Sequence, residues 1–266
     1  MGSPKYRFTP SLLAKWTDFV DSEALYQEFY GNSDEPSVSL EEFEAKQEKE
    51  LWDAINRVPQ EPSEAASRGT LLNVIVDCKV QWERPDAKYK IRRISDERGR
   101  MTAIAGECDE FSFEYDADLC RMLFDYFKGC ICQYRCEATI DTAFGDVILY
   151  GDADYIRRDK VFDLKTTKSY KYGKFEKGWQ KDLYPYCLIE SGDTKNIKGF
   201  EFTVVKWAGG TKTQPLISGE MFREYYTYDH CESAALLRQE CERFIEWLEV
   251  NRDKITNKKI FGLSDE

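Results

Sequence analysis

The sequence predicts an α/β fold in which helices flank a mixed central sheet. Apolar residues recur at helical spacing near both ends of the chain, whereas the middle contains short runs that alternate with a period of two. In this middle part a helix is followed by three strands, a second helix and another strand, an order typical of a sheet covered by helices. The 266 residues are 42% hydrophobic, which is enough for one domain with a substantial core.

The first 60 residues are expected to form a helical extension. Residues 7–30 have helical spacing after Thr9-Pro10, where Thr caps a helix and Pro suits its first turn. Residues 39–56 form a charged amphipathic pattern that begins at Ser39 and has acids in its first turn. Two helices joined by a linker follow from these signals.

The segment before the core strands is less regular. Residues 70–82 are apolar enough for a buried helix, although their β-branched content leaves a strand as the alternative. Residues 83–130 are expected to be an insertion, with polar strands and turns up to 115. A helix over 116–129, with Gly129 as its stop, ends the insertion.

Residues 131–207 are expected to form the core of the sheet. Three short strands are predicted over 133–144, 147–156 and 160–167. A helix over 179–192, despite Pro185, and a strand over 198–207 follow them. The chain then closes with a helix within 231–256.

Composition limits the classes of function. A net charge of −11 argues against a general nucleic-acid coat, because affinity for phosphate comes largely from Lys and Arg. Residues 165–181 differ, since they hold six lysines against one acid, interleaved with aromatic residues. This element is predicted to contact DNA, with a solvated loop as the alternative, through Lys168, Lys171, Lys174, Lys177 and Lys181.

The nine cysteines are an odd number scattered through apolar segments. Reduced buried thiols fit this pattern better than a disulfide framework, so a cytoplasmic location is expected. No run approaches the roughly 20 apolar residues that cross a bilayer, and no secretory leader or membrane partner is predicted.

Acidic residues occupy the two predicted strands of residues 147–167. A hairpin with its tip at 158–159 places Asp154 opposite Asp163, and Asp152 opposite Lys165, with all four side chains on one face. Two such carboxylates repel unless a cation lies between them or one is protonated. Oxygen ligands alone favour Mg²⁺ or Mn²⁺.

Other catalytic classes lack their residues. The chain has one histidine, His230, and contains neither a GxxxxGK[ST] phosphate loop nor a GxSxG elbow. Metal-assisted hydrolysis remains, in which Lys165 orients or helps to deprotonate a water, or stabilises phosphate charge.

These residues resemble the signature of the PD-(D/E)xK nuclease superfamily, in the form found in the RecB-type exonuclease branch. That branch shows GxxD on one strand, DxKT on the next and QxxxY on the following helix. The chain has Gly151 to Asp154, Asp163 to Thr166, and Gln180 with Tyr184 in this order.

The branch also often carries GxxxHxxxE on an upstream helix, and residues 68–77 are similar. Gly69 is followed by Asn73 where the histidine would fall, and by Asp77 in the acidic position. Glu137 matches a frequent supporting acid more loosely. The resemblance therefore implies supporting roles for Asn73, Glu137, Gln180 and Tyr184.

The resemblance implies a restriction-endonuclease-like core and a metal-dependent deoxyribonuclease, most simply an exonuclease of bacterial or phage recombination, repair or DNA processing. Asp154 and Asp163 would hold Mg²⁺ or Mn²⁺ with the carbonyl of Leu164 and with Asp77, and Lys165 would complete the catalytic set. DNA is the expected partner, and the location implied is the cytoplasm of a bacterium or of a phage's host.

Several alternatives stay open. Asp154, Asp163 and Lys165 also fit a surface turn with an ordinary salt bridge. The chain could be a non-catalytic DNA-binding or protein-interaction module that retains the nuclease fold. The residues do not separate DNA from RNA, and they do not decide whether the chain forms a homo-oligomer or binds a recombination partner protein.

Overall fold

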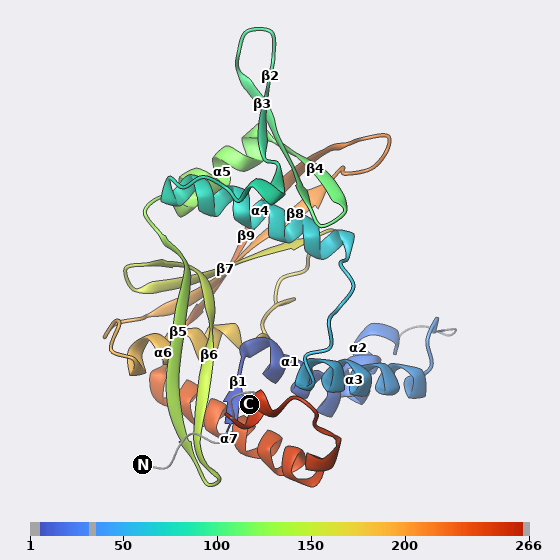
Figure 1. Ribbon diagram of the computed structural model, residues 1–266, viewed down its shortest axis with the longest axis vertical. Helices are drawn as coiled ribbons and strands as arrows, with labels where there is room; N and C mark the ends of the chain where they lie inside the picture. Colours follow the sequence, from blue (N-terminus) through green and yellow to red (C-terminus); the bar gives the residue numbers. More distant parts are fainter. Residues whose placement is uncertain (1–5, 32–35, 263–266) are drawn as a thin grey trace.

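The computed structural model describes residues 6–31 and 36–262 and has an α/β architecture (Figure 1). Within these residues, nine strands form one mixed sheet in the order β1-β6-β7-β8-β9-β4-β3-β2, and β5 pairs with β6 outside this path. The strands are β1 (Tyr6–Phe8), β2 (Arg92–Ser95), β3 (Met101–Cys108), β4 (Phe111–Asp116), β5 (Ile131–Thr142), β6 (Gly145–Arg157), β7 (Lys160–Thr167), β8 (Gly199–Ala208) and β9 (Leu216–Thr227). The predicted class, helices around a mixed sheet, is confirmed.

Seven α-helices lie in the described part of the chain. They are α1 (Pro10–Val20), α2 (Ser22–Tyr30), α3 (Leu40–Ile55), α4 (Glu64–Gln81), α5 (Ala117–Phe127), α6 (Gln180–Glu190) and α7 (His230–Val250). Three short 3-10 helices occupy Ala87–Tyr89, Arg252–Lys254 and Lys258–Phe261. No helix of the described residues is long and apolar enough to span a membrane.

The N-terminal helices begin where their caps predict. Thr9 Oγ1 accepts the Leu12 amide at 3.2 Å, and Pro10 occupies the first turn of α1. Ser39 and Glu42 form a reciprocal capping box at the start of α3. The helix predicted after Thr9-Pro10 does begin at Pro10, but it is divided at Asp21 into α1 and α2, and the short strand β1 that precedes it was not predicted.

Helix α4 resolves the choice between helix and strand over 70–82. It begins at Glu64, where Ser63 Oγ accepts the Ala66 amide at 3.2 Å, and thus starts six residues before the predicted segment. Its buried face packs with α5 against β3, β4 and β7. Arg68 belongs to this buried face, where its guanidinium stacks 3.8 Å from the Trp207 ring centroid.

Residues of the predicted insertion form strands of the same sheet. β4 runs parallel to β9, through the pairs Glu114–Leu216 and Tyr115–Ile217, and β3 pairs antiparallel with β4. Strand β9 had no sequence prediction, although it pairs with β8 over ten positions. The β2–β3 hairpin projects from the body at the top of Figure 1.

Two apolar clusters meet at the central strand β7. Val161 packs with α6, α7 and β1 in one cluster, whereas Phe162 and Leu164 pack with α4 and α5 in the other. Successive residues of a strand point to opposite faces, so one short strand serves both clusters. Asp163 and Lys165 of β7 therefore lie between the two apolar clusters.

Candidate active site

The acidic residues lie where strands β6 and β7 separate. The two strands pair antiparallel at Arg157–Lys160, Ile156–Val161 and Tyr155–Phe162, which agrees with the predicted register. Asp154 and Asp163 are the next positions beyond the last pair. Backbone groups that no longer pair across the strands are therefore free to bind side chains or a ligand at this point.

One such backbone group fixes Asp154. The Leu164 amide donates a hydrogen bond of 2.9 Å to Asp154 Oδ2. Asp163 is almost fully buried, at 4% exposure, and its Oδ2 lies 2.7 Å from Lys165 Nζ. The three predicted catalytic side chains thus meet in one partly solvent-accessible cluster.

Ionisation is strongly coupled in this cluster. Burial and the neighbouring Asp163 carboxylate raise the pKa of Asp154 to about 8, although the Leu164 amide and Lys165 oppose the shift. Burial would lower the pKa of Lys165, but Asp163 and Asp154 outweigh it and raise this pKa. Lys165 is therefore a cation at neutral pH, and Asp154 tends to keep its proton.

Asp152 does not join this cluster, so the predicted set of four side chains is wrong. Its carboxylate is exposed and pairs with Arg135 of β5 at 3.3 Å. β6 has left β7 by this position and pairs with β5, in which Arg135 is the direct partner of Asp152. The divergence of the strands, which local sequence does not encode, separates Asp152 from Lys165.

Helix α4 brings a row of three predicted residues against this part of the sheet. Gly69, Asn73 and Asp77 are four residues apart and share one helix face. At Gly69, an added Cβ would lie 2.9 Å from Thr166 Oγ1 of β7, so the glycine permits close approach of the helix. Asp77, two turns further on, lies close enough to Asp154 to raise its pKa.

Asn73 and Asp77 carry buried oxygens that have no hydrogen-bond partner. These are Asn73 Oδ1 and Asp77 Oδ1, while Asp77 Oδ2 accepts from Gln133 Nε2 at 3.0 Å. Burial raises the pKa of Asp77 to about 6, against the opposing effects of Tyr155 and Gln133. Unpartnered buried oxygens are costly in a folded protein. The Tyr155 hydroxyl, also buried without a hydrogen bond, is a donor beside Asp77, whereas Asn73 Oδ1 is left for another donor or a cation.

Gly151 and Tyr184 form one contact in the structure. A Cβ on Gly151 would lie 2.7 Å from Tyr184 Cε1, so only glycine leaves room for the tyrosine ring against β6. Burial, with smaller effects of the Asp163 and Asp154 charges, raises the pKa of Tyr184. Gln180 begins α6, and its Oε1 lies beside Gly178.

Glu137 lies apart from the site. It is four positions from Gln133 on β5, faces Tyr150 in the sheet register and forms an ion pair of 2.9 Å with Arg7. The structure does not bring it to Asp154. Gln133 contacts Asp77 but was not predicted as a site residue. Its backbone is left-handed, with φ of 49°, and a glutamine in the sequence does not indicate this conformation.

The lysine-rich element is a turn-rich segment between β7 and α6. Lys177 pairs with Glu28 at 3.1 Å, Lys181 pairs with Asp182 at 2.6 Å, and Lys174 donates to Thr167 Oγ1 at 2.7 Å. Among the described residues, Lys168, Lys171 and Lys174 have no acidic partner. The charge of three of the five predicted lysines is thus left uncompensated.

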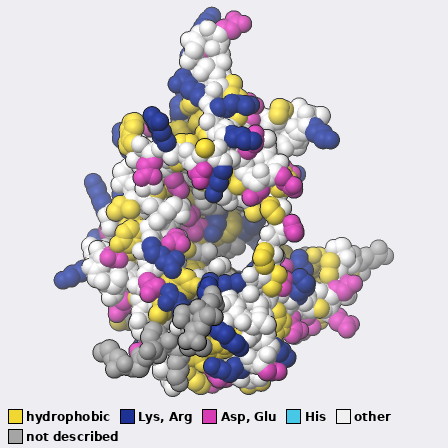
Figure 2. All heavy atoms as spheres, viewed as in Figure 1, with side chains coloured by type: hydrophobic (Ala, Val, Ile, Leu, Met, Phe, Trp, Pro, Cys, Tyr) yellow, Lys and Arg dark blue, Asp and Glu magenta, His cyan; other side chains and the backbone are white. Residues whose placement is uncertain are grey.

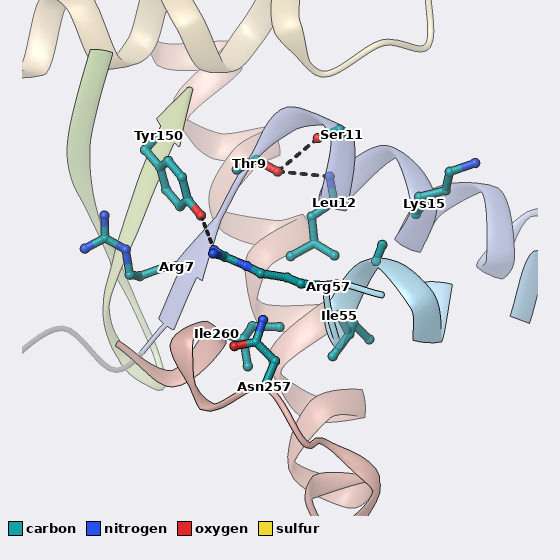
Figure 3. Close-up of a pocket in the computed structure, with 11 residues that line it drawn as sticks. Arg7, Thr9, Ser11, Leu12, Lys15, Ile55, Arg57, Tyr150, Asn257 and Ile260 are labelled. Atoms are coloured by element: carbon teal, nitrogen blue, oxygen red, sulfur yellow. Dashed lines mark hydrogen bonds between the residues drawn. The ribbon is translucent and has the colours of Figure 1, made fainter. Parts of the chain in front are cut away.

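A cavity of about 490 Å³ lies beside β6, toward the N-terminal end of α1 (Figure 3). Arg57 crosses it and donates a 2.9 Å hydrogen bond to the Tyr150 hydroxyl. Tyr150 is four residues from Asp154 along β6, about 13 Å in an extended strand. The carboxylate cluster therefore lies outside this cavity.

The described residues contain no group of three or more His, Cys, Asp or Glu side chains placed to hold a metal. Lys165 Nζ lies 2.7 Å from Asp163 Oδ2, and Gln133 donates to Asp77 Oδ2. The remaining donors are hard oxygens, including the unpartnered Oδ1 atoms of Asn73 and Asp77. Their chemistry fits Mg²⁺ or Mn²⁺ and does not fit a soft metal.

Comparisons with known proteins give little guidance. No protein-family model matches the chain, and no curated protein matches it. One matching solved structure, "Crystal structure of SSO0001", has 12% sequence identity to the chain and a TM-score of 0.39. The match covers 91% of this chain and 78% of that chain. A likeness at this level carries no argument about fold family or activity.

Proposed function

We propose that the protein is a metal-dependent deoxyribonuclease with a PD-(D/E)xK core, and that it acts as an exonuclease of the RecB-type branch. The observation that carries the proposal is the cluster at the divergence of β6 and β7. Asp154, Asp163 and Lys165 meet there, and Asp154 is held by the Leu164 amide. A purely structural salt bridge between Asp163 and Lys165 needs no second carboxyl group beside it, whereas Asp154 lies directly opposite Asp163.

The oxygen donors support a cation site. Asp154 and Asp163 would hold Mg²⁺ or Mn²⁺ with the Leu164 carbonyl, and α4 would add Asp77 and Asn73. When bound, such an ion stabilises negative charge on a phosphodiester and makes a water more acidic. Positive charge between the carboxylates would also remove the repulsion that raises the pKa of Asp154.

The protein's own side chains have separate roles in this proposal. Lys165 remains protonated beside Asp163, so it orients the attacking water and stabilises charge on the phosphate oxygens. Tyr184, whose ring lies against Gly151 of β6, would limit access of bulk water to the site. Hydrolysis would leave a 5′-phosphate, as the family resemblance implies.

The lysine-rich segment supports contact with DNA. Lys168 and Lys171 follow β7 directly and can approach phosphates near the site, whereas Lys174, Lys177 and Lys181 must exchange a partner first. The described residues hold nine free cysteines, consistent with the proposed cytoplasmic setting in a bacterium or a phage's host.

Cleavage of end-labelled DNA tests the proposal. Linear and closed circular DNA, single and double stranded, and RNA are incubated with Mg²⁺, Mn²⁺ or EDTA. The wild type is expected to degrade linear substrate with Mg²⁺ or Mn²⁺ but not with EDTA. Asp163→Asn or Lys165→Ala should slow this cleavage at least about 100-fold. Asp152→Asn is the matched control, because Asp152 is on the same strand as Asp154 but pairs with Arg135.

The second candidate is a DNA-binding or protein-interaction module without catalysis. The pairing of Lys165 with Asp163 and the asparagine at position 73 favour it. Calorimetry with Mn²⁺ separates the two, since a nuclease should bind the ion and lose it in Asp163→Ala. Absence of both metal binding and cleavage in the wild type would reject the nuclease.

A further inference from the structure

A second surface lies at the far end of α4, outside the carboxylate cluster. A groove of about 830 Å³ runs between the end of this helix, the β2–β3 hairpin and α5. Its floor is apolar, and five of the residues that form it are Ile75, Ile91, Met101, Ile104 and Phe124. Asp77 and the groove residue Trp82 are five residues apart on α4, about 7.5 Å along the axis.

Trp82 stands at the mouth of this groove with 83% of its surface exposed. It is the C-cap of α4, in a left-handed conformation with φ of 59°, which is unfavourable for a bulky side chain. Lys79 Nζ lies 4.6 Å from its ring centroid. The other five tryptophans are buried or half-buried, so Trp82 is the one exposed tryptophan.

Cations line the same groove and the arm beside it. Lys79, Arg93, Arg100 and Arg121 belong to the lining, with Glu83 as its single acid. Arg100 pairs with Asp96 at 3.0 Å and Arg121 with Asp118 at 2.5 Å, both just outside the lining, so Lys79 and Arg93 are the cations available to a ligand. Arg93 has no acidic partner among the described residues, and it is held by hydrogen bonds to Ser95 Oγ and the Gly99 carbonyl. Figure 2 shows Lys and Arg side chains along this projecting part of a molecule whose net charge is −11.

The arm is basic in sequence as well as in position. Between residues 79 and 100 the cations are twice as numerous as the acids, with Lys79, Arg84, Lys88, Lys90, Arg92, Arg93, Arg98 and Arg100 against Glu83, Asp86, Asp96 and Glu97. An exposed aromatic face next to immobilised cations suits a nucleobase with its flanking phosphates. A duplex offers no free base face there, whereas a single strand does.

We propose that this groove binds a single-stranded nucleic-acid segment, with a base stacked on Trp82 and phosphates on Lys79 and Arg93. The inference rests on the proposed function for its use, which is to hold the strand that enters or leaves the carboxylate cluster. The distance from the groove to the carboxylate cluster is short along α4, because Asn73 and Asp77 lie within this helix and the groove lies at its C-terminal end.

Binding is measured without catalysis, with a labelled oligonucleotide of about 20 deoxythymidines, the same length of oligouridine, and EDTA throughout. Trp82→Ala is expected to weaken anisotropy-detected binding about 5- to 100-fold, and Trp82→Phe should restore part of it. Lys79→Ala with Arg93→Ala should lower the salt dependence of binding by roughly 0.7 per lost contact. The oligonucleotide should also quench tryptophan fluorescence in the wild type but not in Trp82→Phe.

Phe29→Ala and Lys46→Ala serve as controls, because Phe29 is 67% exposed on α2 and Lys46 is exposed on α3. Unchanged affinity in Trp82→Ala, or no binding by the wild type, overturns the inference. If Trp82→Ala cleaves DNA and binds the oligonucleotide as the wild type does, the nuclease proposal is kept and the groove proposal is rejected. Trp82-dependent binding without cleavage would support the groove and reject the nuclease.

Discussion

Asp154 is the residue whose charge state responds most to the fold. Its ordinary pKa is 3.8, and burial beside Asp163 raises it to about 8. A carboxyl whose pKa is raised in the folded state contributes stability that is present in full below pH 3.8 and is lost as the pH rises toward 8. Asp77, with a pKa of about 6, adds a shift of the same sign over a narrower range.

The free energy of unfolding of the metal-free protein should therefore fall as the pH rises from about 4 to 8. Asp154→Asn should weaken this dependence and raise the stability at pH 8 by about 1–3 kcal/mol, because the amide needs no proton. Thermal unfolding in EDTA at several pH values checks it. Asp152→Asn, which alters an exposed pair, should leave the profile unchanged, and a flat wild-type profile would contradict the assignment.

A bound cation should favour the ionised carboxylates, and it should therefore stabilise the protein most at high pH. Mn²⁺ at pH 8 is expected to raise the melting temperature of the wild type, since ligands that bind only the folded state stabilise it. Asp154→Asn or Asp163→Asn should remove most of this increase. An equal increase in all three proteins would place the ion elsewhere.

At the scale of elements, two close contacts set the distance between helices and the sheet. Gly151 admits Tyr184 of α6, and Gly69 admits α4 to Thr166 of β7. Such glycines let a helix lie close to a strand, at the cost of the extra backbone entropy that glycine loses on folding. Both glycines belong to the sequence patterns from which the site was predicted.

Gly69→Ala separates helix propensity from packing. Alanine should stabilise an unobstructed helix interior by about 0.5–1 kcal/mol, but its Cβ would lie 2.9 Å from Thr166 Oγ1. We expect a net destabilisation of about 1–3 kcal/mol and lower activity. The double variant with Thr166→Ala should recover most of the stability, with Thr166→Ala alone as the control. A more stable Gly69→Ala would show that α4 does not press on β7.

The elements with strong local signals were predicted well. The capping box of α3 and the alternation of β5, β6 and β7 identify these elements from short windows of sequence. β1 was missed because it has three residues and gains its strand character from parallel pairing with β6. β9 was missed because its half-exposed residues and Gly219 blur the alternation, and its pairing with β8 and β4 is non-local.

At the scale of the whole molecule, one sheet connects two apolar clusters. β7 supplies Val161 to one cluster and Phe162 with Leu164 to the other. Phe162 is 1% exposed and packs edge-on to Phe127 with a centroid distance of 5.9 Å. Loss of this ring disturbs the strand that both clusters share.

Phe162→Ala is expected to lower the free energy of unfolding by about 3–5 kcal/mol, the usual cost of removing a buried aromatic ring. Because both clusters share β7, the loss should shift a single transition instead of producing a second one. Calorimetry and tryptophan fluorescence should report coincident transitions. Two separated transitions would mean that the halves unfold independently.

The sequence by itself determined the α/β class, the β6–β7 register and the identity of Asp154, Asp163 and Lys165 as a cluster. These depend on local periodicity and on a short hairpin, which neighbouring residues specify. Only the tertiary structure decided that Asp152 and Glu137 pair elsewhere, that Tyr184 rests on Gly151, and that α4 brings Asp77 to the site. These depend on strand divergence, helix approach and burial, which arise from contacts between distant segments and leave no pattern in a local window of sequence.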